Sequence, residues 1–139
     1  MTQQTWEKTF PAKIEDVPAM VSFVADAAES VEMHPKRVMH LQLAVEEATV
    51  NVCNYAYEVP PGELQITIEK QGTRLVVKIE DEGVPFDPLT LEAPDLTARV
   101  EERSVGGLGV YLMKRVMDEV HYYREGKRNV LILIVNLSS

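Results

Sequence analysis

The chain has 139 residues, 45% of them apolar, which is the size and composition of one domain with a single sizeable core. Acidic residues outnumber basic ones by 22 to 14, and the resulting net charge of −8 disfavours binding to the phosphate backbone of nucleic acid. Because Cys53 is the only cysteine, an internal disulfide and a cysteine-based metal cluster are excluded. We expect one domain over residues 1–139.

The first half of the chain predicts one strand and two helices. Residues 5–10 alternate in the manner of a strand, which Pro11 ends. Apolar residues then recur at intervals of three and four from Val17 to Val31, and again from Pro35 to about Tyr57. The second of these helices is long, and polar residues interrupt its apolar pattern.

The second half predicts two hairpins. Apolar segments 64–68 and 75–79 flank a turn that contains Gly72, and segments 120–123 and 130–135 flank a turn that contains Gly126. Both pairs are therefore expected to be antiparallel.

Two different sequence patterns lie between the hairpins. Residues 81–103 are acidic and weakly periodic, which is typical of a mobile segment, and a helical period then begins near Val110 and continues to Asp118. The complete order of elements predicts an α+β fold. We expect a two-layer α/β sandwich, with a mixed, mostly antiparallel sheet and helices on one face.

The N-terminus has no basic flank followed by an apolar stretch, so a secretory signal is not predicted. No run approaches the roughly 20 apolar residues of a membrane span. We therefore expect a cytoplasmic protein that binds neither membrane nor nucleic acid. A basic protein surface is a more natural partner for this charge.

Glu47 and Asn51 are four residues apart in the second predicted helix. Their side chains therefore share one face of the helix, one turn apart, and a carboxylate and a carboxamide would point to the same place. A solvated polar face is the alternative, and the neighbouring Glu46 fits it best.

Asp81 ends an apolar strand, and Gly83 and Phe86 follow it closely. A carboxylate there can accept a hydrogen bond from an amino group, and a glycine lets a flat ring approach the backbone. An ordinary strand-ending turn would give the same pattern.

Three glycines stand at the start of the last predicted helix, in the run Gly106, Gly107, Leu108, Gly109. Glycines with free N–H groups at a helix start form a cradle for phosphate, although glycines also open helices that bind nothing. The run matches neither a Walker loop nor a dinucleotide fingerprint. His34, His40 and His121 have no metal-like spacing, and no serine lies in a hydrolase elbow.

Taken in order, Glu-x-x-x-Asn on a helix, Asp-x-Gly-x-x-Phe after a strand and Gly-Gly-x-Gly before a helix resemble the GHKL ATPase and kinase superfamily. Its members share the Bergerat ATP-binding fold. The short length of the chain and the sequence pattern from Glu47 to Tyr57 resemble those of the anti-sigma factor serine/threonine kinases. The resemblance extends roughly from Phe10 to Val135.

The resemblance implies a kinase that uses ATP and Mg²⁺. Asn51 would supply an oxygen ligand to Mg²⁺, and Glu47 would be the general base on the attacking hydroxyl. Asp81 would accept the adenine amino group, and residues 87–103 would form a lid. The implied nucleotide-binding set is Asn51, Asp81, Gly83, Phe86, Arg103, Gly106, Gly107, Leu108 and Gly109.

The resemblance also implies the partners. The phosphate acceptor would be a serine or threonine of an anti-sigma factor antagonist, and the second partner would be a sigma factor. Two copies of the chain would pair through the side of the first strand as a homodimer.

Three positions depart from the family pattern. Tyr55 stands where these kinases usually carry a histidine, and Val105 stands where a basic residue often precedes the glycines, although Arg103 is close enough to substitute. The last strand, 130–134, lacks the threonine that commonly supports the aspartate. These changes affect turnover more than ATP binding.

Two other functions remain open from the sequence. The chain could be a binding module in which nucleotide controls a partner-binding surface without turnover. The catalytic domain of a sensor histidine kinase is less consistent, because the chain has no room for a helical region bearing a phosphoacceptor histidine.

Overall fold

The computed structural model describes residues 4–57, 62–90 and 107–138. Its strands and main helices, in chain order, are β1 (Thr5–Pro11), α1 (Val17–Ser30), α2 (Pro35–Asn51), β2 (Glu63–Gln71), β3 (Arg74–Asp81), α3 (Gly107–Val116), β4 (Glu119–Glu125) and β5 (Arg128–Asn136). Three short helical segments complete the description: Ile14–Asp16, a π turn at Val52–Ala56, and Pro88–Thr90. The predicted order of strands and helices is confirmed.

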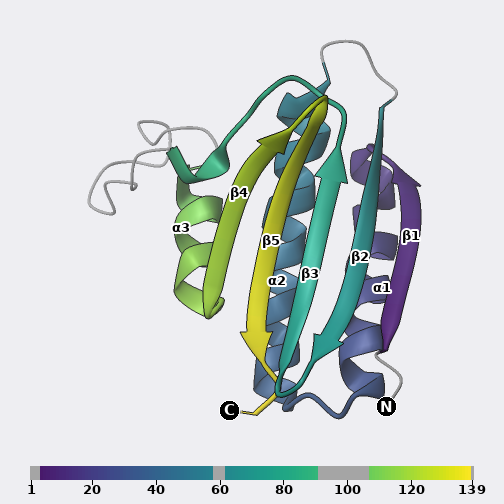
Figure 1. The fold of residues 1–139 in the computed structure, drawn as a ribbon, viewed down its shortest axis with the longest axis vertical. Coiled ribbons are helices and arrows are strands. Elements are labelled where there is room, and N and C mark those ends of the chain that lie inside the picture. Colours follow the sequence, from purple (N-terminus) through teal and green to yellow (C-terminus); the bar gives the residue numbers. More distant parts are fainter. Residues whose placement is uncertain (1–3, 58–61, 91–106, 139) are drawn as a thin grey trace.

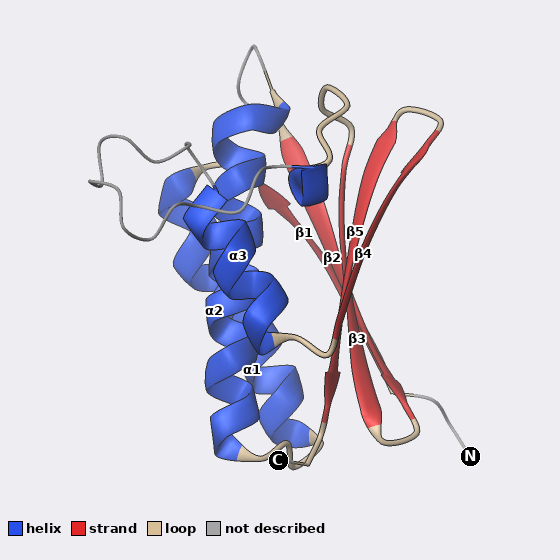
Figure 2. Cartoon of the chain, turned by 90° about the vertical axis from the view of Figure 1, so that its left-hand side faces the viewer, coloured by secondary structure: helices blue, strands red, loops and turns tan. Residues whose placement is uncertain are grey.

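The five strands form one sheet in the order β1-β2-β3-β5-β4 (Figure 1). Helices α1, α2 and α3 lie against one face of it, so the protein has the two layers that the sequence predicts (Figure 2). All four pairings are antiparallel, where a mixed sheet was expected. The connection through α3 does make β4 run in the direction of β3, but β5 lies between these two strands.

Each hairpin turns through a glycine. Gly72 joins β2 to β3 with φ of 64°, and Gly126 joins β4 to β5 with φ of 59°. Two-residue hairpin loops need positive φ at their first position, which glycine adopts without steric cost. The turns therefore hold both hairpins in register.

The core lies between the sheet and the helices. Leu75, Val77 and Ile79 of β3 are buried in alternation with partly exposed residues, and α2 buries Leu41 and Val45 against the same layer. Asp81 is the next residue in the buried row of β3, so the row of apolar side chains ends in a carboxylate.

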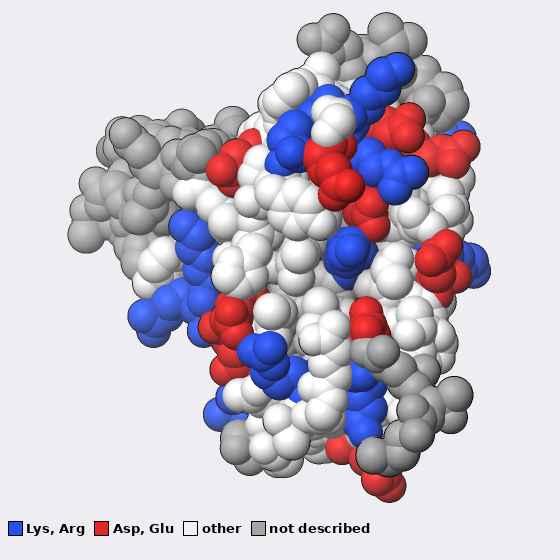
Figure 3. Space-filling model, in the orientation of Figure 1, with Lys and Arg blue, Asp and Glu red and all other residues white. Residues whose placement is uncertain are grey.

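The opposite face of the sheet is open to solvent and carries charges of both signs (Figure 3). Arg128 of β5 lies there 3.1 Å from Glu80 of the neighbouring β3, and Arg74 of β3 is bonded across β5 to Glu119 of β4. Such mixed charge gives no continuous basic surface of the kind that binds nucleic acid. None of the helices in the described part of the chain is long and apolar enough to cross a membrane.

Candidate functional site

A cavity of about 30 Å³ lies where β3, β5 and the end of α2 meet. Its walls include the apolar side chains of Ile79 and Leu131. Its polar groups come from four separate segments of the chain: Asn51, Asp81, Tyr122 and Asn129. Apolar walls with a few converging polar groups are typical of a small-molecule site.

Asp81 lines this cavity, and the hydrogen bonds that it accepts from the described residues end on one carboxylate oxygen. Its side chain is 6% exposed, and its Oδ1 accepts hydrogen bonds from the backbone N–H of Gly83 and from Asn129 Nδ2, each at 2.9 Å. No hydrogen bond from the described residues reaches Oδ2. Burial raises the pKa of Asp81, while the bonds from Asn129 and Gly83 and the charge of Arg124 act to lower it.

Asn51 is the last residue of α2 and is only 7% exposed. Its Nδ2 has no hydrogen-bond partner within the described residues. Buried polar groups are nearly always satisfied, so this amide nitrogen beside a cavity indicates a partner from outside the described residues. Which carboxamide atom is oxygen is an assignment, so the group is equally suited to offer an oxygen ligand.

Glu47 lies one turn before Asn51 and contacts the start of α3. A Cβ atom placed on Gly109 would lie 2.1 Å from Glu47 Oε2, so only glycine at position 109 allows this approach. The carboxylate is half-buried, and its pKa is raised by that burial and by the neighbouring charge of Glu46. Glu47 does not line the cavity, but it lies one turn from Asn51, which does, and its role stays a prediction. Glu46 is exposed to solvent as expected.

Gly83 is required by a backbone contact. A Cβ atom at position 83 would lie 2.1 Å from the carbonyl oxygen of Ala56, and the N–H of Val84 donates to the same oxygen at 2.7 Å. Ala56 ends the π turn that continues α2. This contact explains the glycine, and the close approach of a ring to it stays a prediction.

Phe86 forms part of the cavity wall, and the ring of Tyr55 packs against the ring of Phe86. The two ring centroids are 5.5 Å apart and the planes are tilted by 31°. At the position where a histidine was expected by resemblance, the tyrosine therefore packs at the edge of the site.

Helix α3 begins at Gly107, three residues before the predicted start near Val110. Gly107, Leu108 and Gly109 thus form its first turn, whose N–H groups have no partner within the helix. The predicted site residues Arg103 and Gly106 lie outside the described residues, as do Val105 and most of the segment 87–103.

Asn129 was not predicted, although it holds the site together. It follows the turn of the second hairpin, where asparagine is common, and it contacts Asp81 only because β3 and β5 pair with these two residues opposite each other. The sequence of neither strand alone predicts that these two residues pair. Residues 130–135 are all apolar, so the last strand has no alternation that could have indicated this pairing.

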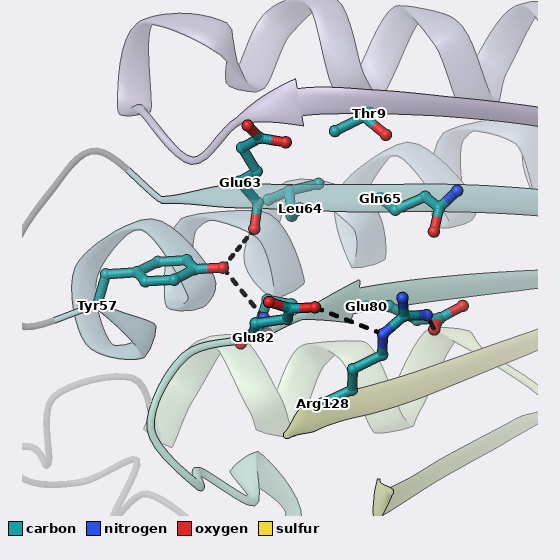
Figure 4. Close-up of a pocket in the computed structure, with 9 residues that line it drawn as sticks. Thr9, Tyr57, Glu63, Leu64, Gln65, Glu80, Glu82 and Arg128 are labelled. Carbon is teal, nitrogen blue, oxygen red and sulfur yellow. Dashed lines mark hydrogen bonds and ion pairs between the residues drawn. The ribbon is translucent and has the colours of Figure 1, made fainter. Parts of the chain in front are cut away.

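A larger hollow of about 510 Å³ lies on the solvent side of the sheet. Figure 4 shows the hydroxyl of Tyr57 there, donating to the carbonyl of Glu63 at 2.6 Å and accepting from the N–H of Glu82 at 3.1 Å. Glu63, Glu80 and Glu82 line this hollow with Arg128. The excess of carboxylates would repel phosphate, so the smaller cavity is the better nucleotide site.

The family model for the histidine kinase-like ATPase domain matches residues 10–135. The chain belongs to this family. The superfamily predicted from the three motifs is thereby confirmed, and membership implies the use of ATP.

The chain is also similar to proteins named serine-protein kinase RsbW. Those of Bacillus cereus (strain AH820), Bacillus anthracis and Bacillus thuringiensis (strain Al Hakam) are each 28% identical to it over 130 residues. These matches cover 91% of the chain and 81% of each relative.

Replacing Asp81 with Asn is expected to remove a pH dependence of stability. Because burial raises the pKa of Asp81 above its ordinary value of about 3.9, the folded protein holds this proton more tightly than the unfolded chain does. This contribution to stability is complete below the ordinary value and is lost as the pH rises through the folded value. In urea unfolding from about pH 4 to pH 7 the parent should lose stability relative to Asp81→Asn.

The exposed neighbour Glu82 supplies the control, and Glu82→Gln should follow the parent. A difference between parent and Asp81→Asn that stays constant with pH would contradict a raised pKa at Asp81.

A methyl group at position 109 is expected to push the Glu47 carboxylate into solvent, because the added Cβ would overlap Oε2. Burial is the main cause of the raised pKa of Glu47, so in Gly109→Ala this carboxylate should titrate closer to its ordinary range. NMR titration of the side-chain carboxyl carbon, assigned by its loss in Glu47→Gln, measures the change. An unaltered titration would rule out the close contact between α2 and α3.

Proposed function

We propose that this chain is a serine/threonine protein kinase that uses ATP and Mg²⁺ to phosphorylate an anti-sigma factor antagonist in a partner-switching circuit. One observation carries the proposal. The half-buried carboxylate of Glu47 lies against Gly109 at the start of α3, one helical turn from Asn51, whose amide nitrogen has no hydrogen-bond partner within the described residues. The serine-protein kinases named above, which align with 91% of the chain, support the same activity.

The nucleotide would be held at both ends of the site. Asp81 Oδ2 would accept a hydrogen bond from the 6-amino group of adenine, inside walls that Phe86 and Leu131 help to form. The free N–H groups in the first turn of α3, at Gly107 to Gly109, would donate to phosphate oxygens.

Asn51 would supply the oxygen ligand to Mg²⁺. Within the described residues no group of three or more histidine, cysteine, aspartate or glutamate side chains could hold a metal by itself. A single carboxamide suits Mg²⁺, which keeps several waters and usually binds with the phosphates of a substrate. When bound, the metal neutralises charge on the phosphates during transfer.

Glu47 would remove the proton from the acceptor hydroxyl. As the hydroxyl oxygen forms its bond to the γ-phosphorus, the bond to the departing ADP oxygen breaks and the proton moves to the carboxylate. A raised pKa makes Glu47 a stronger base than an exposed glutamate, and it brings the carboxylate closer to the operating pH.

The partners are proposed on chemical grounds and on the resemblance. The antagonist would present a serine or threonine to Glu47, and a sigma factor would be the second partner. A net charge of −8 favours a partner with a basic surface. We propose that the protein acts in the cytoplasm, as a homodimer paired through the side of β1.

A second function is favoured by one observation. Tyr55 replaces the expected histidine and packs against Phe86, 5.5 Å between centroids, so nucleotide binding would move this aromatic pair. A binding module would use that movement to change a partner-binding surface without phosphate transfer. Both functions use the same nucleotide site, and they differ in turnover.

The substitution Glu47→Gln separates the two functions. If Glu47 is the general base, transfer of labelled γ-phosphate to antagonist proteins from the same organism should fall roughly a hundredfold to ten-thousandfold. Binding of ATP, measured by calorimetry, should stay near that of the parent. Glu46→Gln, which changes the exposed neighbour, is the matched control and should transfer phosphate like the parent.

Transfer at the parental rate by Glu47→Gln would show that another group is the base. A parent that binds ATP and changes its affinity for a partner, yet transfers nothing, would establish the binding module.

The substitution Asn51→Ala tests the metal site. In the parent, Mg²⁺ should increase the affinity for ATP, and this increase should be lost in Asn51→Ala while metal-free binding remains. Asn54→Ala removes an exposed carboxamide from the adjoining π turn and should behave as the parent does. Equal dependence on Mg²⁺ in parent and Asn51→Ala would exclude Asn51 as the ligand.

A further inference from the structure

Asn129, the second residue of β5, has a carboxamide whose hydrogen bonds are all used. Nδ2 donates to Asp81 Oδ1 at 2.9 Å and to the carbonyl of Val84 at 2.8 Å. Oδ1 accepts from the N–H of Phe86 at 3.2 Å and from the hydroxyl of Tyr122. A carboxamide offers two donors and accepts two bonds, so no capacity remains for a ligand.

These partners also fix the orientation of the group. Asp81 Oδ1 and the carbonyl of Val84 are acceptors, and the N–H of Phe86 is a donor. Turning the carboxamide over would place oxygen against oxygen and N–H against N–H. The side chain is 5% exposed, so such a mismatch would carry the full cost of unpaired buried groups.

Asn129 helps to hold one of the two carboxylate oxygens of Asp81. Its bond and the bond from Gly83 both end on Oδ1, so Oδ2 remains as the acceptor for a ligand. The two side chains face each other because Asp81 and Asn129 are opposite residues in the β3–β5 pair. Burial raises the pKa of Asp81, and the N–H donated by Asn129 opposes protonation.

The same carboxamide holds the wall of the cavity. Its bonds to Val84 and Phe86 tie the segment after β3 to β5, and Phe86 lines the cavity beside Asp81. One side chain therefore sets the distance between the acceptor oxygen and the aromatic wall.

We propose that Asn129 is a positioning residue for purine recognition, which holds Asp81 as an oriented acceptor and thereby selects a 6-amino purine over a 6-oxo purine. The inference rests on the proposed function, because it requires that a purine nucleotide bind in this cavity. A 6-amino group donates to Oδ2, whereas a 6-oxo group places a second acceptor against the carboxylate. A carboxylate that is free to rotate or to take up a proton loses this distinction.

The test compares Asn129→Thr with Asn129→Val, two side chains of equal shape of which only threonine has a hydroxyl donor. Binding of ATP and of inosine triphosphate, each with Mg²⁺, is measured by calorimetry. The preference for ATP should fall roughly tenfold or more in Asn129→Val, since a buried acceptor has lost its donor. Asn129→Thr should keep most of the preference, because cross-strand neighbours are within reach of a hydroxyl.

Asn136→Val makes the same change at the other end of β5 and should keep the parental preference. If Asn129→Val does not fold, the smaller pair Asn129→Ser and Asn129→Ala gives the same comparison. Thermal unfolding without nucleotide separates a loss of stability from a loss of selectivity.

A parental preference for ATP in Asn129→Val would overturn the proposal, as would equal losses in the threonine and valine variants. Failure of the proposed function has a different signature, because the parent itself would then show no Mg²⁺-dependent ATP binding. That result would overturn both.

Discussion

The register between β3 and β5 is the constraint on which the site depends. Ile79 lies opposite Leu131 and Asp81 lies opposite Asn129, so each buried apolar row ends in one of two polar residues. A shift of β3 by one residue would turn its apolar row toward solvent and Asp81 away from Asn129. The burial of the core side chains therefore holds the two polar residues together, and the contact does not rely on its own hydrogen bond alone.

Much of the fold follows from periodicity. Alternation, apolar runs and three-to-four spacing predict the order of the five strands and three main helices described, and a spacing of four places Glu47 and Asn51 on one face of α2. The start of α3 was placed too late, because glycine is a poor helix former and Gly107 and Gly109 weaken the local pattern. Packing against Glu47 in α2 overrides that preference, since the contact needs a residue without a side chain.

Contacts between distant segments could not be predicted. In the sequence Asn129 has the pattern of an ordinary turn residue, and its contact with Asp81 follows only from the pairing of β5 with β3. Gly83 was predicted to let a flat ring approach the backbone, whereas the structure places the carbonyl of Ala56 beside it. The π turn at Val52–Ala56 has no signal in the apolar pattern, although such turns are frequent at functional sites. The motif residues were thus found in the sequence, and the residues that orient them were found in the structure.

The small volume of the cavity links nucleotide affinity to a change of shape. About 30 Å³ holds a water or two, whereas ligand pockets usually measure about 300 Å³ or more. A purine would therefore bind a more open form, and the measured affinity would be the intrinsic affinity scaled by the population of that form. A partner that prefers the open form strengthens nucleotide binding, and the nucleotide strengthens the partner's binding by the same factor. The small cavity would in this way couple the proposed nucleotide binding to the proposed binding of a partner.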